Sequence, residues 1–136
     1  MQSILEISLK KIQNNWKLLN KYSNYKSSAV VKANAYGHGI VEISSTLEKQ
    51  YEINTLCVVN SEEGILLRNH NVKKPILILG YINSPLENVV SYKLEVTLYD
   101  KSMIKHLNNI ARKQNTRVPI HIKIDTGLSR MGIMPQ

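Results

Sequence analysis

The sequence contains no phenylalanine and a single cysteine, and its longest apolar run extends only from Ile76 to Ile82. The lone Cys57 cannot form an internal disulfide, which fits a reducing cytoplasm. A bilayer-spanning helix needs about 20 apolar residues, so we expect no membrane partner. No basic stretch followed by an apolar core opens the chain, and export is therefore not indicated. With 43% hydrophobic and 21% charged residues in 136, the composition predicts a packed cytoplasmic domain, or part of a larger one.

Acidic residues are scarce, with 10 Asp+Glu against 18 Lys+Arg and a net charge of +8. A basic domain can bind nucleic acid, because neutralising phosphates dominates that affinity. Here the basic residues are scattered from Lys10 to Arg130, and no aromatic stacking platform is interleaved with them. This pattern favours a solvated basic surface and no nucleic-acid partner. An anionic small ligand, or an acidic remainder if the chain is incomplete, could also account for part of the charge.

Short apolar runs rich in β-branched residues alternate with segments of helical periodicity. Such continuous runs are typical of strands buried on both faces of a parallel sheet. The predicted strands are residues 29–33, 55–59, 76–80, 95–98 and 119–124. The apolar positions that predict the helices are Leu9, Ile12, Trp16 and Leu19; Ile40, Ile43 and Leu47; Ile65 and Leu66; Val89 and Val90; and Ile104, Leu107 and Ala111.

Helix-start signals support this alternation. Residues 84–87, Ser-Pro-Leu-Glu, predict a serine N-cap, a proline in the first helical position and a capping-box glutamate. Residues 60–63 form a similar cap, and Asp100 precedes a predicted helix over 101–114. The order is one helix, four β-α units and a fifth strand. Two α/β architectures contain such units, an open doubly wound sheet and an eight-stranded (β/α) barrel cut just past its midpoint.

Residues 29–39, Ala-Val-Val-Lys-Ala-Asn-Ala-Tyr-Gly-His-Gly, place Lys32 near the carboxyl end of a buried strand. Both architectures position their chemistry at that end. Apolar surroundings disfavour an ammonium, and the neutral amine is the form that condenses with an aldehyde. Tyr36 could reach a phosphate from the loop. The alternative is a surface lysine followed by a turn, because the third glycine of a dinucleotide fingerprint is missing and no P-loop is present.

Residues 121–132, His-Ile-Lys-Ile-Asp-Thr-Gly-Leu-Ser-Arg-Met-Gly, put polar residues at alternate positions of the fifth strand. In a closed barrel His121, Lys123 and Asp125 would share the inward side. Asp-Thr-Gly then suits a tight loop. An inward Lys123 would need a partner or a modification, since an unpaired buried charge is costly. Alternatively, Lys123 and Asp125 only solvate the end of a strand.

Residues 30–39 resemble the pyridoxal-phosphate attachment motif of bacterial alanine racemases, and residues 121–132 are similar to a second segment of that family. The resemblance implies that Lys32 is both the Schiff-base lysine and a catalytic base on one face of the substrate Cα. It implies that Tyr36 hydrogen-bonds the cofactor phosphate. Lys123 would carry a carbamate whose charge orients Arg130, and Arg130 would face the phenolic oxygen of pyridoxal 5'-phosphate and the substrate carboxylate. The resemblance implies no metal site.

The resemblance covers the whole chain and implies the first five strands of a parallel (β/α)8 TIM-type barrel. Residues 1–136 would be the amino-terminal part of a homodimeric enzyme that interconverts L- and D-alanine and supplies D-alanine for peptidoglycan. Three more barrel strands, a carboxyl-terminal β domain and a second catalytic base would lie outside these residues, so the chain alone would be inactive. Two alternatives share the barrel: a non-catalytic pyridoxal-phosphate carrier and an amino-acid racemase of broader specificity.

Overall fold

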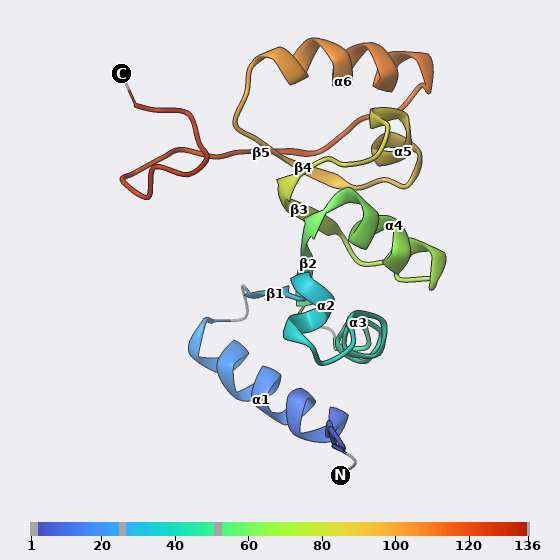
Figure 1. Ribbon diagram of the computed structural model, residues 1–136, viewed down its shortest axis with the longest axis vertical. Coiled ribbons are helices and arrows are strands. Elements are labelled where there is room, and N and C mark those ends of the chain that lie inside the picture. Colours follow the sequence, from blue (N-terminus) through green and yellow to red (C-terminus); the bar gives the residue numbers. More distant parts are fainter. Residues whose placement is uncertain (1–2, 25–26, 51–52, 136) are drawn as a thin grey trace.

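The computed structural model describes residues 3–24, 27–50 and 53–135. Helices and strands alternate along these ranges as the sequence predicts (Figure 1). None of the helices in them is long and apolar enough to cross a membrane. The strands are β1 (Ser27–Val30), β2 (Ile53–Asn60), β3 (Ile76–Tyr81), β4 (Glu95–Leu98) and β5 (Ile120–Ile122). The helices are α1 (Leu9–Tyr22), α2 (Lys32–Tyr36), α3 (Ile40–Glu48), α4 (Ser61–Asn69), α5 (Leu86–Ser91) and α6 (Ser102–Lys113).

All five strands belong to one parallel sheet, and their order in space is β1-β2-β3-β4-β5. A doubly wound sheet reverses its strand order at a switch point, whereas a barrel adds each strand beside the previous one. The unbroken order therefore decides between the two architectures that the sequence left open. Neighbouring helices also contact one another in sequence from α3 to α6, which makes them a single outer layer. The fold is the α/β arrangement of a (β/α) barrel.

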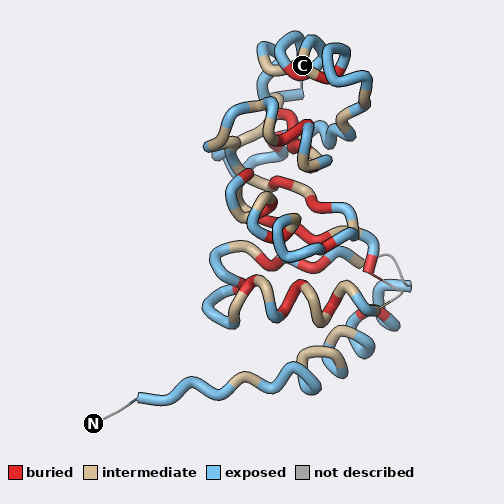
Figure 2. The backbone as a smooth tube through the Cα atoms, turned by 90° about the vertical axis from the view of Figure 1, so that its right-hand side faces the viewer, coloured by how far each residue is buried: buried red, intermediate tan, exposed pale blue. Residues whose placement is uncertain are grey.

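The main core lies between the sheet and these helices (Figure 2). Leu56, Val58, Ile76 and Ile78 on the helix-facing side of β2 and β3 have no exposed surface. Burial of this kind contributes about 25 cal/mol per Å² of apolar surface and is the main force that fixes the layer. By contrast, the segment that precedes α1 is exposed along most of its length.

Two of the three predicted helix starts have the expected polar contacts. Asn60 caps α4, and its Oδ1 accepts a 2.9 Å hydrogen bond from the backbone N–H of Glu63. Asp100 accepts hydrogen bonds from the backbone and hydroxyl of Ser102 at the start of α6, although the residue at the cap position is Lys101. Each contact satisfies donors that a helix leaves open in its first turn.

The predicted serine cap of α5 is wrong. Pro85, with extended ψ of 138°, occupies the cap position, and the helix begins at Leu86. The backbone N–H of Ser84 instead donates to the hydroxyl of Ser61, which also exchanges hydrogen bonds with Asn83. These hydrogen bonds hold the loop against the start of α4, so Ser84 does not cap α5. The Ser84 hydroxyl is left buried without a partner among the described residues.

Candidate active site

Lys32 follows β1 at the carboxyl end of the sheet, as the sequence predicts. The chain is still held to the sheet just before it, because the backbone N–H of Val31 donates to the carbonyl of Cys57 at 2.9 Å. Val31 is buried, and Lys32 is partly buried. Among the described residues Lys32 takes part in no ion pair. Its amine is therefore not committed to holding the fold together.

The five residues of α2 include a left-handed helical turn. Ala33, Asn34, Ala35 and Tyr36 all have φ between 51° and 54°. For residues with a side chain this conformation costs roughly 1–2 kcal/mol each, and strain of this size persists only where the surroundings impose it. The sequence signalled a tight loop through Gly37 and Gly39, but not a left-handed turn. Strain beside a lysine at a strand end is typical of a functional site.

Several hydrogen bonds hold this turn in place. The side-chain Oδ1 of Asn34 accepts from the backbone N–H of Ile40 at 2.9 Å and so caps α3. The backbone N–H groups of Gly37 and Gly39 both donate to the carbonyl of Asn34 at 3.0 Å. On the other side, the backbone N–H of Asn34 donates to the carboxylate of Glu63. Asn34 is thus the most heavily bonded residue of the turn.

Tyr36 and His38 have different environments in the same loop. The Tyr36 side chain is 62% exposed, so its phenol is available to a ligand. The His38 ring lies against the turn, with Nδ1 3.0 Å from the carbonyl of Ala35 and 3.2 Å from that of Tyr36. These contacts hold the His38 ring as part of the turn.

The second motif forms a loop that folds back on the end of its strand. The backbone N–H of Asp125 donates to the carbonyl of Ile133 at 3.0 Å, and that of Ile133 donates to Lys123 at 2.8 Å. Gly132 has φ of 143°, and a Cβ there would lie 2.5 Å from the Asp125 nitrogen, so no larger residue fits.

Asp125 organises the inside of this loop. Its Oδ1 accepts from the backbone N–H of Gly127 at 2.9 Å and of Ser129 at 3.0 Å. These two bonds, with a further contribution from the positive charge of Lys123, hold the pKa of the Asp125 carboxyl below its usual value. Arg130 follows at the exposed tip of the loop, and Lys123 is partly buried at its base.

The structure brings the predicted site residues together in two groups. Lys32 and Tyr36 follow β1, whereas Lys123 and Arg130 follow β5. Both groups lie at the carboxyl ends of parallel strands, but β1 and β5 are the two outer strands of the five-stranded sheet. No hydrogen bond or ion pair between the groups occurs in the ranges that the structure describes.

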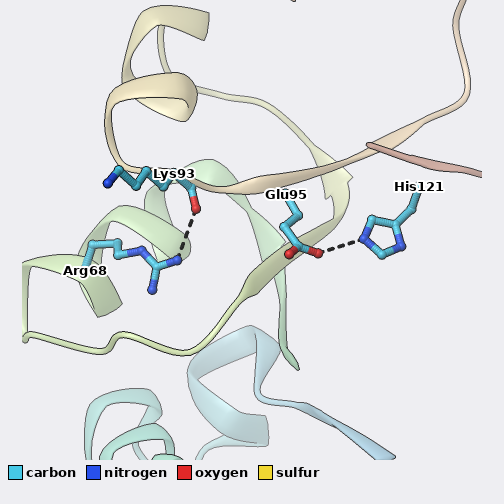
Figure 3. A network of polar contacts seen from close by, with 4 residues as sticks. All are labelled: Arg68, Lys93, Glu95 and His121. Carbon is cyan, nitrogen blue, oxygen red and sulfur yellow. Dashed lines mark hydrogen bonds and ion pairs between the residues drawn. The ribbon is translucent and has the colours of Figure 1, made fainter. Parts of the chain in front are cut away.

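A polar pair that the sequence analysis did not identify joins β4 to β5 (Figure 3). His121 Nε2 lies 2.7 Å from Glu95 Oε2, with 49% and 17% of the two side chains exposed. This contact explains how the sheet tolerates His121, which the sequence placed inward. Burial, and secondarily the charge of Glu95, raises the pKa of the Cys57 thiol. Cys57 pairs with Leu77 of β3 and Leu77 pairs with Glu95 of β4, so Cys57 and Glu95 lie on the same side of the sheet.

Arg68 stabilises the opposite end of the sheet from Lys32. Its guanidinium donates to four backbone carbonyls at 2.8–3.1 Å, those of Val72, Lys74, Tyr92 and Lys93. Figure 3 shows the bond to Lys93. Burial lowers the pKa of this group, with opposing contributions from nearby carboxylates. Arg68 therefore fixes the loops that enter β3 and β4, and the fold uses four of its five N–H donors.

Fold and site together define a (β/α)-barrel protein in which a lysine follows the first strand, directly precedes a strained turn and takes part in no ion pair with the described residues. Residues 7–136 match the family model described as "Alanine racemase, N-terminal domain", and the chain belongs to the alanine racemase family. It is 41% identical over 134 residues to an alanine racemase of Clostridium perfringens, covering 96% of this chain and 34% of that protein. It is 40% identical over 135 residues to one of Methanococcus maripaludis, covering 96% and 36%.

Solved structures give the same result. An alanine racemase of Clostridium difficile superposes with a TM-score of 0.79 at 35% identity, over 90% of this chain and 34% of that one. One from a D-cycloserine-producing Streptomyces lavendulae gives a TM-score of 0.85 at 25% identity, over 93% and 34%. The chain thus spans about a third of the length of the curated relatives it matches. The resemblance read from residues 30–39 and 121–132 is confirmed at the level of the family.

Proposed function

We propose that this chain is the amino-terminal part of a pyridoxal-phosphate-dependent enzyme that interconverts L- and D-alanine. The observation that carries the proposal is Lys32, which follows β1, directly precedes a strained turn and has no ion-pair partner among the described residues. Family membership supports the reaction, because the relatives are named alanine racemases. An enzyme of this kind in a reducing cytoplasm would supply D-alanine for peptidoglycan.

The residues around β1 fit pyridoxal 5'-phosphate. Lys32 offers a primary amine for the aldehyde, and the exposed phenol of Tyr36 offers a hydrogen bond to the phosphate. Gly37 and Gly39 have positive φ, which glycine adopts readily, and because they have no Cβ their backbone can come close to a ligand. When bound, the cofactor supplies an electron sink for the charge left at the substrate Cα. Lys32 then has a second role, moving a proton at one face of that carbon.

Lys123 and Arg130 would complete the site from the other edge of the sheet. We assign Arg130 to the phenolic oxygen of the cofactor and to the substrate carboxylate, both of which a guanidinium recognises well. A carbamate on Lys123 would turn a partly buried cation into an anion and orient Arg130. As the two groups follow the outer strands of the sheet, both can contact one ligand only where the sheet curves into a closed barrel. Two such chains would form a homodimer.

The test uses a completed enzyme, in which residues 1–136 are joined to the remaining two thirds of the Clostridium perfringens relative. After incubation with pyridoxal 5'-phosphate, borohydride reduction and peptide mapping should locate the adduct on Lys32. Lys32→Ala should lose the adduct and racemise alanine at least about 10²-fold more slowly, because a positioned proton-transfer group contributes about that much. Lys49→Ala, in an exposed position at the end of α3, is the control. Labelling elsewhere with Lys32 unmodified would refute the assignment.

A further inference from the structure

We propose that Glu63 of α4 is a positioning residue for Lys32, acting through the backbone of Asn34. The inference rests on the proposed function of Lys32 and adds a residue from a different β-α unit to the site. Glu63 is 31 positions away from Lys32 in the sequence, and nothing in the two motifs points to it. Its place in the structure is at the carboxyl end of the sheet, directly after β2.

The carboxylate of Glu63 joins three segments of the chain. One oxygen, Oε2, accepts a 2.9 Å hydrogen bond from the backbone N–H of Val59 at the end of β2. The other, Oε1, accepts from the backbone N–H of Asn34, at 3.4 Å, in the left-handed turn. The backbone N–H of Glu63 is itself bonded to Asn60 Oδ1 at 2.9 Å, which fixes the first turn of α4. The side chain thus connects the loop after β1 to the frame formed by β2 and α4.

An ordinary helix cap does not require the second of these contacts. A capping-box glutamate returns to backbone donors at the start of its own helix, and the bond from Val59 fulfils much the same role. The bond from Asn34 comes instead from a turn of four left-handed residues, a conformation that the side chains of Ala33, Ala35 and Tyr36 disfavour. Lys32 lies two residues before Asn34, so a shift of this turn would also move the backbone of Lys32. Among the described residues, Glu63 belongs to another β-α unit and its side chain is hydrogen-bonded to the turn.

Glu63→Gln separates the positioning role from the capping role. The amide keeps the size of the side chain but has one acceptor oxygen, so it can serve only one of the two N–H groups. The shorter bond from Val59 is the one we expect it to keep, which leaves the amide NH₂ facing the N–H of Asn34. Helix α4 then remains capped while the turn loses its contact.

Glu62→Gln is the matched control. Glu62 precedes Glu63 in the same first turn of α4 and is exposed. Its replacement removes the same charge from the amino end of the helix, where an acidic residue interacts favourably with the helix dipole. The Glu62 side chain makes no hydrogen bond within the described part of the chain. Its backbone N–H donates to Asn83 Oδ1 at 3.3 Å, and substitution of the side chain leaves that bond intact. A difference between the two variants therefore measures the contact with Asn34.

The experiment compares both variants with the parent completed enzyme by hydrogen exchange and by kinetics. We expect Glu63→Gln to speed exchange of the Asn34 amide about tenfold, as the loss of one hydrogen bond does, with no change in β2 and β3. Borohydride trapping of pyridoxal 5'-phosphate on Lys32 should slow, and kcat should fall about ten- to hundredfold with KM for alanine little changed. Glu62→Gln should match the parent in every measurement.

The outcomes separate this inference from the proposed function. If Glu63→Gln and Glu62→Gln give the same Asn34 exchange and the same trapping rate, Glu63 does not position Lys32 and the inference is wrong. The inference is also wrong if the changes in kcat and KM of Glu63→Gln are fully explained by its lower thermal stability. If the parent enzyme forms no adduct at Lys32, the proposed function fails, and with it the catalytic meaning of the contact. Faster exchange at Asn34 in Glu63→Gln alone would then show only that the carboxylate holds the turn.

Discussion

The contacts of single residues show which features of the candidate site the two motifs predict and which depend on the fold. Lys32 and Asp125 have the placements that their neighbours in the sequence predict, one after a strand and the other in a tight loop. The pairing of Asn34 with Glu63 was not predictable, because it joins residues 29 positions apart. The contact between Glu95 and His121 was also missed, since it depends on the register of two neighbouring strands. Local patterns identify residues, and the register of the sheet determines their partners.

At the same scale, the Asp125 loop should depend on pH in the acid range. Its pKa is lowered by hydrogen bonds that only the folded loop provides, so the ionised carboxylate stabilises the loop. That contribution is complete above the unfolded pKa of about 3.9 and is lost as the pH falls through the folded pKa. An NMR titration of the Asp125 carboxyl carbon should give a midpoint below the value for an unfolded peptide. A midpoint at or above that value would contradict the expectation.

A residue-resolved measurement is needed because Asp100 also has a lowered pKa, caused by its hydrogen bonds from Ser102. Asp125→Asn provides the control. The amide retains an acceptor oxygen for Gly127 and Ser129, so the loop should survive at neutral pH, while its acid transition should disappear. Asp125→Ala, which has no acceptor, should instead release the amides of residues 127 and 129 to hydrogen exchange at every pH.

The strands and helices could be predicted as elements because segments that pack in a core are rich in apolar residues. Each predicted apolar run overlaps an observed strand. The expected burial on both faces is nearly met in β4, but it is wrong for the outer strands, since Val30 of β1 is 44% exposed and all three residues of β5 are exposed. The strand bounds differ by a few residues; β1, for example, ends at Val30 rather than at residue 33. The left-handed turn explains that difference, because it begins where the apolar run continues. Alanine and tyrosine have no preference for positive φ, so their sequence could not reveal it.

One prediction at the element scale concerns how α4 is held against the sheet. Leu67 has no exposed surface, whereas its neighbour Leu66 is 40% exposed. In the completed enzyme, Leu67→Ala should lower the free energy of unfolding by about 2–5 kcal/mol, because it leaves a cavity under a packed helix. Leu66→Ala should change it by about 0.5 kcal/mol. Hydrogen exchange of the β2 and β3 amides measures both effects, and equal losses in the two variants would refute this account of the core.

At the scale of the whole molecule, the strand order carries information that no segment of the sequence contains. Repeated β-α units are compatible with two architectures, and only the succession β1-β2-β3-β4-β5 identifies the barrel. The same succession determines the candidate site, since it puts the Lys32 turn and the Arg130 loop on outer strands of one sheet. The proposed contact of both loops with one ligand would therefore need a closed barrel, and tests of it belong in the completed enzyme.

The roles proposed for Lys123 and Arg130 can be distinguished there by chemical rescue. If Lys123 acts as a carbamate, its contribution is a negative charge beside Arg130, and Lys123→Ala should lose most of the racemase activity. A small carboxylate such as acetate should restore part of that activity by supplying the missing anion. Arg130→Ala should also lose activity, but an anion cannot replace a guanidinium that binds the cofactor oxygen and the substrate carboxylate, so acetate should not help it.

The control for this rescue is Lys105→Ala, an exposed residue of α6, which removes a positive charge outside both motifs. Its activity should match that of the parent, with or without acetate. Rescue of both Lys123→Ala and Arg130→Ala to the same extent would indicate a general effect of ionic strength, and rescue of neither would show that Lys123 does not act as an anion. Rescue of Lys123→Ala alone would indicate that the enzyme needs a negative charge at the base of the Asp125 loop. The unmodified Lys123 side chain is a partly buried cation there.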